Sequence, residues 1–474
     1  MTSNKLTPCA MAVLAALLAC APAAHAQSNE DLLKELRALR QRVEDLESKL
    51  KAPTVPTTPA ANAQWGMTPQ QVQDFNRIAV KTEALEDAVE AQGLKSLKIS
   101  GYIDPSYLYN QRQDRAGFQF LNPVALDGYN YDNSYFGSAV LDLQKEMEGG
   151  TKWRLSLMPN RATGSVTGDG SIVNEASVSI PLGNLQTRFI AGQVPDWSGY
   201  EYQQATLNKL ITHNLLFDFT LPTLYTGAGM EYSRGKWLVK WMLNNMNSSK
   251  RGAGEKTPAL AYRVDYAKGE FVGFGFAGVN GMATNYRASG VNPVTSEAYS
   301  SRNTRLDLIE ADAYFIRGDL TWQGQLSYGR QRQAAISADP LSGNLRDASW
   351  WGASTLLAYK FMPRWEAIGR LDYLNNSKNG GGLLGYTVAD DRNGIGPNAT
   401  LGCDPALAGN AVDCDKGSNR MALSLGVSWL YNLNTSFKAE ARFDQASQPV
   451  FIDMRTGDYR KTNAVFGTSV VVSF

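Results

Sequence analysis

The sequence predicts an all-β fold, a transmembrane antiparallel β-barrel of about 16 strands with an N-terminal periplasmic coiled coil. Three observations predict it. From Leu97 onward, apolar and polar residues alternate in segments of strand length. Tight turns and long connections alternate between these segments, as they do in barrels that cross a membrane. The last segment, residues 465–474, carries an apolar stripe of period two and ends on Phe474, which suits a membrane interface.

Residues 1–26 have the features of a secretory signal peptide. Lys5 precedes an apolar run over residues 10–19, and the triplet Ala-His-Ala at 24–26 is a small-x-small cleavage site. A competing site exists, because residues 17–20 resemble a lipoprotein box that would place a lipid on Cys20. In both cases the mature protein is exported.

Residues 27–51 are expected to form a coiled coil, because their apolar residues are spaced alternately four and three apart. These residues are Leu32, Leu36, Leu39, Val43, Leu46 and Leu50. The alternative is a single amphipathic helix. Residues 52–66 form a linker rich in Pro, Thr and Ala. Residues 67–93 form a second helix, which begins at a capping box over residues 68–71 and ends at Gly93.

Composition fits an exported barrel. The chain has 43 Gly and 10% aromatic residues, and its mean hydropathy of -0.30 excludes a helical membrane protein. A net charge of +1 does not favour nucleic acid as a partner. Cys403 and Cys414 are expected to form a disulfide. A metal site is the weaker alternative, because only His213 remains after processing, and no cofactor is expected.

The barrel is expected to occupy residues 97–474. The predicted strands are 97–109, 134–147, 151–158, 171–182, 185–192, 224–233, 236–244, 258–267, 270–279, 305–317, 319–330, 349–360, 364–374, 419–431, 435–444 and 464–474. Every second connection is tight, and the tight ones are 148–150, 183–184, 235, 268–269, 318, 361–363 and 432–434. With both termini in the periplasm, this alternation places every long loop on the outside.

Charged residues are expected to face the interior, because a charge on the lipid face costs ~2–4 kcal/mol at mid-depth. A barrel of this size leaves an aqueous channel. The residues expected to line the pore are Lys152, Arg154, Arg188, Lys240, Arg263, Asp265, Glu310, Asp312 and Arg370. The alternative for any one of them is that it only pairs with a neighbour.

The third long connection, 193–223, differs from the others because it is rich in leucine and phenylalanine. So apolar a loop needs a wall on which to pack. We expect it to fold into the lumen as a constriction loop that presents Asp196, Glu201, Lys209 and Asp218. The alternative is a loop packed against a neighbouring subunit.

Short motifs carry a resemblance to known families. They are Gly-Tyr-Ile-Asp at 101–104 with Tyr107 and Tyr109, Glu-Ala-Ser-Val at 175–178 before Pro-Leu-Gly at 181–183, and Ala-Gly-Gln at 191–193 with Gly-Tyr-Glu at 199–201, Pro222 and Thr-Gly at 226–227. Here the chain resembles the β-barrel porins described as OmpL-like, and more closely an uncharacterised outer-membrane family with the same signal, coiled-coil and barrel layout. The resemblance implies a porin-like barrel and no particular solute.

These observations together predict an outer-membrane porin of a Gram-negative cell, with its coiled coil in the periplasm. It is expected to be a homotrimer in outer-membrane lipid that passes small hydrophilic solutes or ions. The alternative is a structural barrel that tethers the envelope or binds a partner without conducting. An enzyme is not expected. A lipase-like site needs a His–Ser pair on the rim, and His213 is the only histidine that remains after processing.

Overall fold

The computed structural model describes residues 96–121, 137–158, 172–246, 256–285, 291–292, 294–299, 303–335, 338–339, 341–378, 418–449 and 451–474, with five isolated residues before them. The chain divides into two units, Met1–Gly93 and Leu94–Phe474. In the first unit, the five described residues are helical: Gln73, Arg77, Ile78, Val80 and Lys81. The predicted signal peptide, coiled coil, linker and Cys403–Cys414 disulfide lie outside the described residues.

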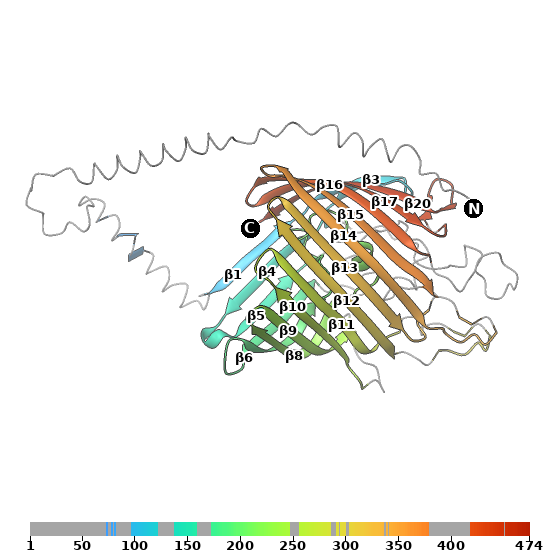
Figure 1. Cartoon of the computed structure of the whole chain (residues 1–474), viewed down its shortest axis with the longest axis horizontal. Coiled ribbons are helices and arrows are strands. Elements are labelled where there is room, and N and C mark those ends of the chain that lie inside the picture. Colours follow the sequence, from blue (N-terminus) through green and yellow to red (C-terminus); the bar gives the residue numbers. More distant parts are fainter. Residues whose placement is uncertain are drawn as a thin grey trace, which may run out of the picture. The chain divides into compact units, whose positions relative to one another are not determined.

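The second unit is a closed antiparallel barrel of 16 strands, which confirms the predicted fold class and strand number (Figure 1). The strands are β1 (Leu97–Ile103) continued by β2 (Ser106–Asn110), β4 (Ala139–Glu146), β5 (Lys152–Leu157), β6 (Val173–Pro181), β7 (Thr187–Pro195), β8 (Leu224–Arg234), β9 (Trp237–Met246), β10 (Ala259–Ala267), β11 (Val272–Thr284), β12 (Asn303–Arg317), β13 (Leu320–Gln331), β14 (Ala348–Met362), β15 (Trp365–Lys378), β16 (Arg420–Asn432), β17 (Thr435–Ala446) and β20 (Thr462–Ser473). Each pairs with the next, and β20 closes the ring by pairing with β1 and β2.

The tight connections lie where the sequence predicts them. A short 3-10 helix, η2 (Glu148–Gly150), joins β4 to β5. Gly235 and Gly318 adopt φ of 59° and 56°, a left-handed conformation that glycine enters without steric cost. We call this rim the tight-turn end of the barrel and the opposite rim the loop end. At the loop end, β18 (Phe451–Ile452) and β19 (Tyr459–Arg460) form a separate hairpin between β17 and β20.

The first barrel strand differs from its prediction as one strand over 97–109, because it breaks at Asp104-Pro105. Pro105 has no N–H to donate to a ladder. The Asp104 N–H donates to the Ser138 carbonyl at 2.9 Å, and the Pro105 carbonyl accepts from Val470 at 3.1 Å. Beyond the break, β2 pairs with β3 (Arg115–Gln119) instead of β4. Next to this break, β4 and β5 are short, with 8 and 6 residues against 15 in β12.

Side chains alternate between an apolar outer face and a charged inner face. On β17, Phe437 and Phe443 are exposed, whereas Lys438, Glu440 and Arg442 are buried inside the ring. Along β20 burial also alternates over Phe466–Ser469, but the inward side chains there are small and uncharged. An apolar exterior suits lipid, because charges on that face would be unsolvated. None of the helices among the described residues is long and apolar enough to cross a membrane.

Phe474 completes the ring closure. Its backbone exchanges two hydrogen bonds with Gly101, at 3.0 and 3.1 Å. Its ring lies over Gly101, where an added Cβ would be 2.7 Å from the ring.

We expect deletion of Phe474, or Phe474→Asp, to reduce insertion into the outer membrane, because a carboxylate is unfavourable where the ring is favoured. Surface labelling of cells measures the loss; undiminished labelling of both variants would contradict this role.

Candidate functional site

The third long connection folds back inside the barrel. We call its residues 196–223 the inner loop; they run between β7 and β8 and contain the helix α4 (Leu215–Phe219). Asn214 caps α4 by accepting a hydrogen bond from the Phe217 N–H at 2.8 Å. The helix contacts β14, β15 and β16, all on the side of the ring opposite to the strands from which the loop departs (Figure 1).

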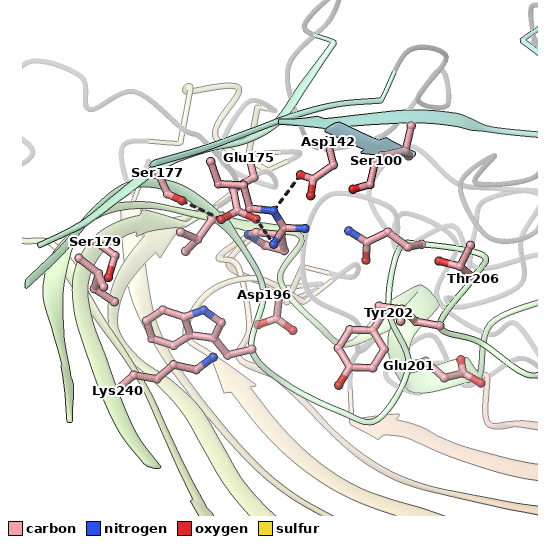
Figure 2. A pocket seen from close by; sticks show the side chains of 18 of the residues that line it. Ser100, Asp142, Glu175, Ser177, Ser179, Asp196, Glu201, Tyr202, Thr206 and Lys240 are labelled. Atoms are coloured by element: carbon pink, nitrogen blue, oxygen red, sulfur yellow. Dashed lines mark hydrogen bonds and ion pairs between the residues drawn. The ribbon is translucent and has the colours of Figure 1, made fainter. Parts of the chain in front are cut away.

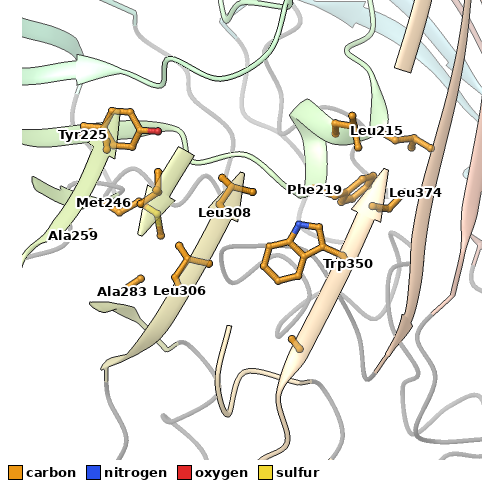
Figure 3. Close-up of a cluster of buried hydrophobic side chains, with 14 of the residues drawn as sticks. Leu215, Phe219, Tyr225, Met246, Ala259, Ala283, Leu306, Leu308, Trp350 and Leu374 are labelled. Carbon is orange, nitrogen blue, oxygen red and sulfur yellow. The ribbon is translucent and has the colours of Figure 1, made fainter. Parts of the chain in front are cut away.

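The apolar part of the inner loop packs on an apolar patch of the inner wall at the loop end. Leu215, Leu216 and Phe219 are buried against Leu306, Trp350 and Leu374 (Figure 3). Two wall glycines make room for loop leucines: a Cβ on Gly352 would be 2.3 Å from Leu216, and one on Gly426 would be 2.4 Å from Leu210. The leucine-rich sequence of the loop therefore has a wall to match it.

Charged groups of the wall bind the backbone of the inner loop. The Glu440 carboxylate accepts from the N–H groups of Ile211 and Thr212 at 2.7 and 2.8 Å. The Arg370 guanidinium donates to the carbonyls of Thr212 and His213 at 2.6 and 2.8 Å. Arg370 also pairs with Glu201 at 2.8 Å and is fully buried. These bonds satisfy backbone groups that would otherwise be buried without partners.

Further contacts continue this anchoring toward the tight-turn end. The Lys438 ammonium donates to the carbonyls of Ala205 and Asn208 at 2.7 and 2.6 Å. Lys209 of the loop pairs with Glu366 of β15 at 2.7 Å. Because charged wall groups hold it along much of its length, the inner loop is a fixed part of the interior.

A cavity of about 820 Å³ lies between the first half of the inner loop and a wall formed mainly by β1 and β4–β10, with the C-terminal end of β20 (Figure 2). The wall contributes Asp142, Arg154, Glu175, Glu231, Lys240, Arg263 and Asp265, and the loop contributes Asp196, Trp197, Glu201, Tyr202 and Gln204. Glu231 and Lys240 face each other across the β8–β9 ladder, four positions or fewer from its tight turn. The cavity therefore reaches toward the tight-turn end.

Two guanidinium groups in the cavity are each shared by two carboxylates. Arg154 pairs with Asp142 at 2.8 Å and with Glu175 at 3.0 Å. Arg263 pairs with Asp265 at 2.7 Å and with Asp312 at 2.8 Å. The Lys240 ammonium instead lies over the Trp197 ring, 4.7 Å from its centroid, which is a cation–π contact.

Burial shifts the pKa of several titratable groups of the inner loop, among them Asp196 and His213. Burial raises the pKa of Asp196 to about 6, although hydrogen bonds from Tyr225 and Ser198 oppose the shift. Burial also lowers the pKa of His213, so its imidazole is neutral at pH 7. The His213 ring stacks on Phe217 with centroids 4.0 Å apart, and its Nε2 lies 2.7 Å from the Tyr202 carbonyl.

The structure brings together some of the predicted pore residues and separates others. Arg154, Lys240, Arg263 and Asp265 line the cavity with Asp196 and Glu201 of the loop. Lys152 pairs with Glu146 at the tight-turn rim, and Arg188 donates to the carbonyls of Gly150 and Ser179. Glu310, Asp312 and Arg370 are buried. Lys209 pairs with Glu366, and Asp218 lies 3.7 Å from Arg442.

Sequence reasoning missed several cavity residues. Asp142 and Glu231 occupy inward positions of β4 and β8, so the period-two pattern could have identified both. Trp197 and Tyr202 could not be identified in this way, because the path of the inner loop has no period. The sequence predicts that Lys152, Arg154 and Arg188 all line the pore, and of the three Arg154 lines the cavity.

Comparisons with known proteins give one family match and several structural similarities at low sequence identity. A family model described as "Protein of unknown function (DUF3138)" matches residues 4–474. The outer membrane channel DcaP of Acinetobacter baumannii is similar with a TM-score of 0.50 at 10% identity, over 80% of this chain and 97% of that one. The anion-selective porin from Comamonas acidovorans has a TM-score of 0.48 at 10% identity, over 80% of this chain and 99% of that one. Salmonella typhi OmpF has a TM-score of 0.45 at 11% identity, over 80% of this chain and 97% of that one. Curated proteins provide no sequence match.

Proposed function

Since the chain belongs to the DUF3138 family, whose function is unknown, and has a porin-like barrel, we propose that it is an outer-membrane porin. In this proposal it forms a water-filled diffusion channel for small hydrophilic solutes or ions. The motifs that resemble OmpL-like porins support the same function. The observation that carries the proposal is the charged cavity of about 820 Å³ between the inner loop and the wall of β1 and β4–β10.

The chemistry of the cavity favours water within it. Charged side chains from both the wall and the loop converge there, among them Arg154, Glu175 and Glu231. Removing such groups from water is costly unless every charge is paired and hydrogen-bonded. Glu231 makes no hydrogen bond or salt bridge to the described residues and faces Lys240 across the β8–β9 ladder, so water in the cavity would hydrate its carboxylate. The inner loop then acts as the constriction, with Asp196 and Glu201 at its edge.

Single-channel recording tests the proposal. Refolded full-length protein in planar lipid bilayers is expected to show discrete conductance steps. Gln204→Trp places a bulky ring in the cavity and should lower the step size. Thr468→Trp places the same ring on the outer face of β20, where the side chain is exposed, and should leave the step unchanged. Protein that shifts in mobility on heating, as folded barrels do, but never conducts would refute the proposal.

We further propose that the protein is a homotrimer in the outer membrane, held in part by the coiled coil over residues 27–51. The heptad seam of that segment needs partner helices to bury its leucines. Cross-linking of the full-length protein is expected to give a trimer. The triple replacement of Leu36, Val43 and Leu50 by Gln should weaken it without removing the barrel. A monomer as the sole cross-linked species would exclude the trimer.

One observation favours a second candidate function, a structural barrel without a conducting pore. At the loop end, Met242, Leu306 and Trp350 point inward and are buried almost completely in one apolar cluster. An apolar plug at this level would close the lumen to water and ions. The same bilayer recording separates the two candidates, because a plugged barrel inserts without conductance steps.

A further inference from the structure

We propose that the passage is selective for small cations, and that Glu231 strengthens this selectivity while Lys240 weakens it. The inference rests on the proposed function, because selectivity requires a conducting channel. It deepens that function by naming the class of solute and two residues that determine it.

Carboxylates outnumber cations among the side chains that line the cavity. The carboxylates are Asp142, Glu175, Asp196, Glu201, Glu231 and Asp265, and the cations are Arg154, Lys240 and Arg263. A cleft with an excess of one sign of charge and walls of low dielectric constant concentrates ions of the opposite sign. The cavity therefore attracts cations and repels anions.

Pairing within the protein does not cancel this excess. Arg154 and Arg263 are each shared by two carboxylates, so each cluster retains a negative charge. Glu201 shares Arg370 with Asp372, which lies 3.1 Å from the same guanidinium. In each case the guanidinium is shared by more than one carboxylate, and the Arg154 and Arg263 clusters each leave one negative charge that acts on the solution in the cavity.

The excess also survives protonation of Asp196, one of two inner-loop carboxylates in the cavity, whose pKa burial raises to about 6. At pH 7 this group is mostly ionised. If it is counted as neutral, the remaining five carboxylates still exceed the three cations. The sign of the field is thus independent of the state of Asp196.

Glu231 and Lys240 are the two cavity charges best placed to tune this field. They are cross-strand partners on β8 and β9. Neither makes a salt bridge or hydrogen bond to the described residues, and the Lys240 ammonium lies over the face of Trp197. Their charges are therefore available to passing ions, and replacing either side chain breaks few contacts.

The reversal potential in a potassium chloride gradient across a planar bilayer tests the inference. The full-length protein should give a potassium-to-chloride permeability ratio above one. Glu231→Gln should lower the ratio and Lys240→Gln should raise it, each on the order of two- to fivefold, the effect of a unit charge 4–8 Å from the ion in water. Asp458→Asn is the matched control, because that exposed carboxylate lies in the loop between β18 and β19 and pairs with Arg460 of β19.

The outcomes are distinct. A conducting channel with a ratio at or below one would overturn the inference and leave the proposed function intact. So would Glu231→Gln and Lys240→Gln channels that conduct with the ratio of the unmodified protein. A folded barrel without conductance would overturn both the proposed function and the inference.

Discussion

Removal of residues 203–218 is expected to raise single-channel conductance by a factor on the order of two or more, since a barrel of this size has a wide lumen once no loop occupies it. This segment contains most of the inner loop that crosses the interior, including Lys209, Thr212 and the first residues of α4. On the side away from the cavity, its Lys209 and Thr212 contact Glu366 and Glu440 of the wall. Solute discrimination should relax with the wider passage.

A matched variant distinguishes the effect of the loop's contacts with the wall from the effect of its length. Replacing residues 203–218 with a Gly/Ser segment of the same length retains the chain but removes its contacts with Arg370, Glu440 and Lys438. We expect an intermediate conductance with larger current noise, because a flexible segment samples many positions. If both variants insert and assemble but conduct like the unmodified protein, the inner loop does not limit passage.

Arg370→Met is expected to cause the largest loss of stability of any single replacement in the interior, about 3–5 kcal/mol. The guanidinium is fully buried and binds Glu201, Asp372 and two carbonyls of the inner loop. Its removal leaves two buried carboxylates without their main cation. The temperature at which the folded band converts to the unfolded band in detergent electrophoresis should fall markedly, and the inner loop should become sensitive to protease.

Two control variants test this interpretation. Arg370→Lys keeps the charge but has no planar fork to reach several acceptors at once, so its transition temperature should lie between those of the unmodified protein and Arg370→Met. Arg305→Met removes a guanidinium that pairs with Asp307 on the exposed part of β12, and the transition temperature should hardly change. Equal transition temperatures for Arg370→Met and Arg305→Met would show that Arg370 does not anchor the loop.

The sequence by itself determines the strands, their alternation of short and long connections, and the face on which each side chain lies. These features depend on a local period of two and on local turn chemistry, as at Gly235 and Gly318. The inward positions of Arg154, Lys240, Arg263 and Asp265 follow from the same period. The break at Asp104-Pro105 is also local, and the proline in that segment was its signal.

Only the tertiary structure decides what the inward side chains meet. Glu440 binds the backbone of Ile211 and Thr212, and Lys209 pairs with Glu366. These contacts form because the inner loop crosses the full width of the ring to reach the opposite wall. No local pattern links such partners, because closure of the barrel and the path of the inner loop bring them together. The same path withdraws Lys209 and Asp218 from the cavity and leaves Glu231 and Lys240 facing it. A strand shows in its sequence which side faces inward, whereas the rest of the chain decides which interior charges meet a partner and which meet the cavity.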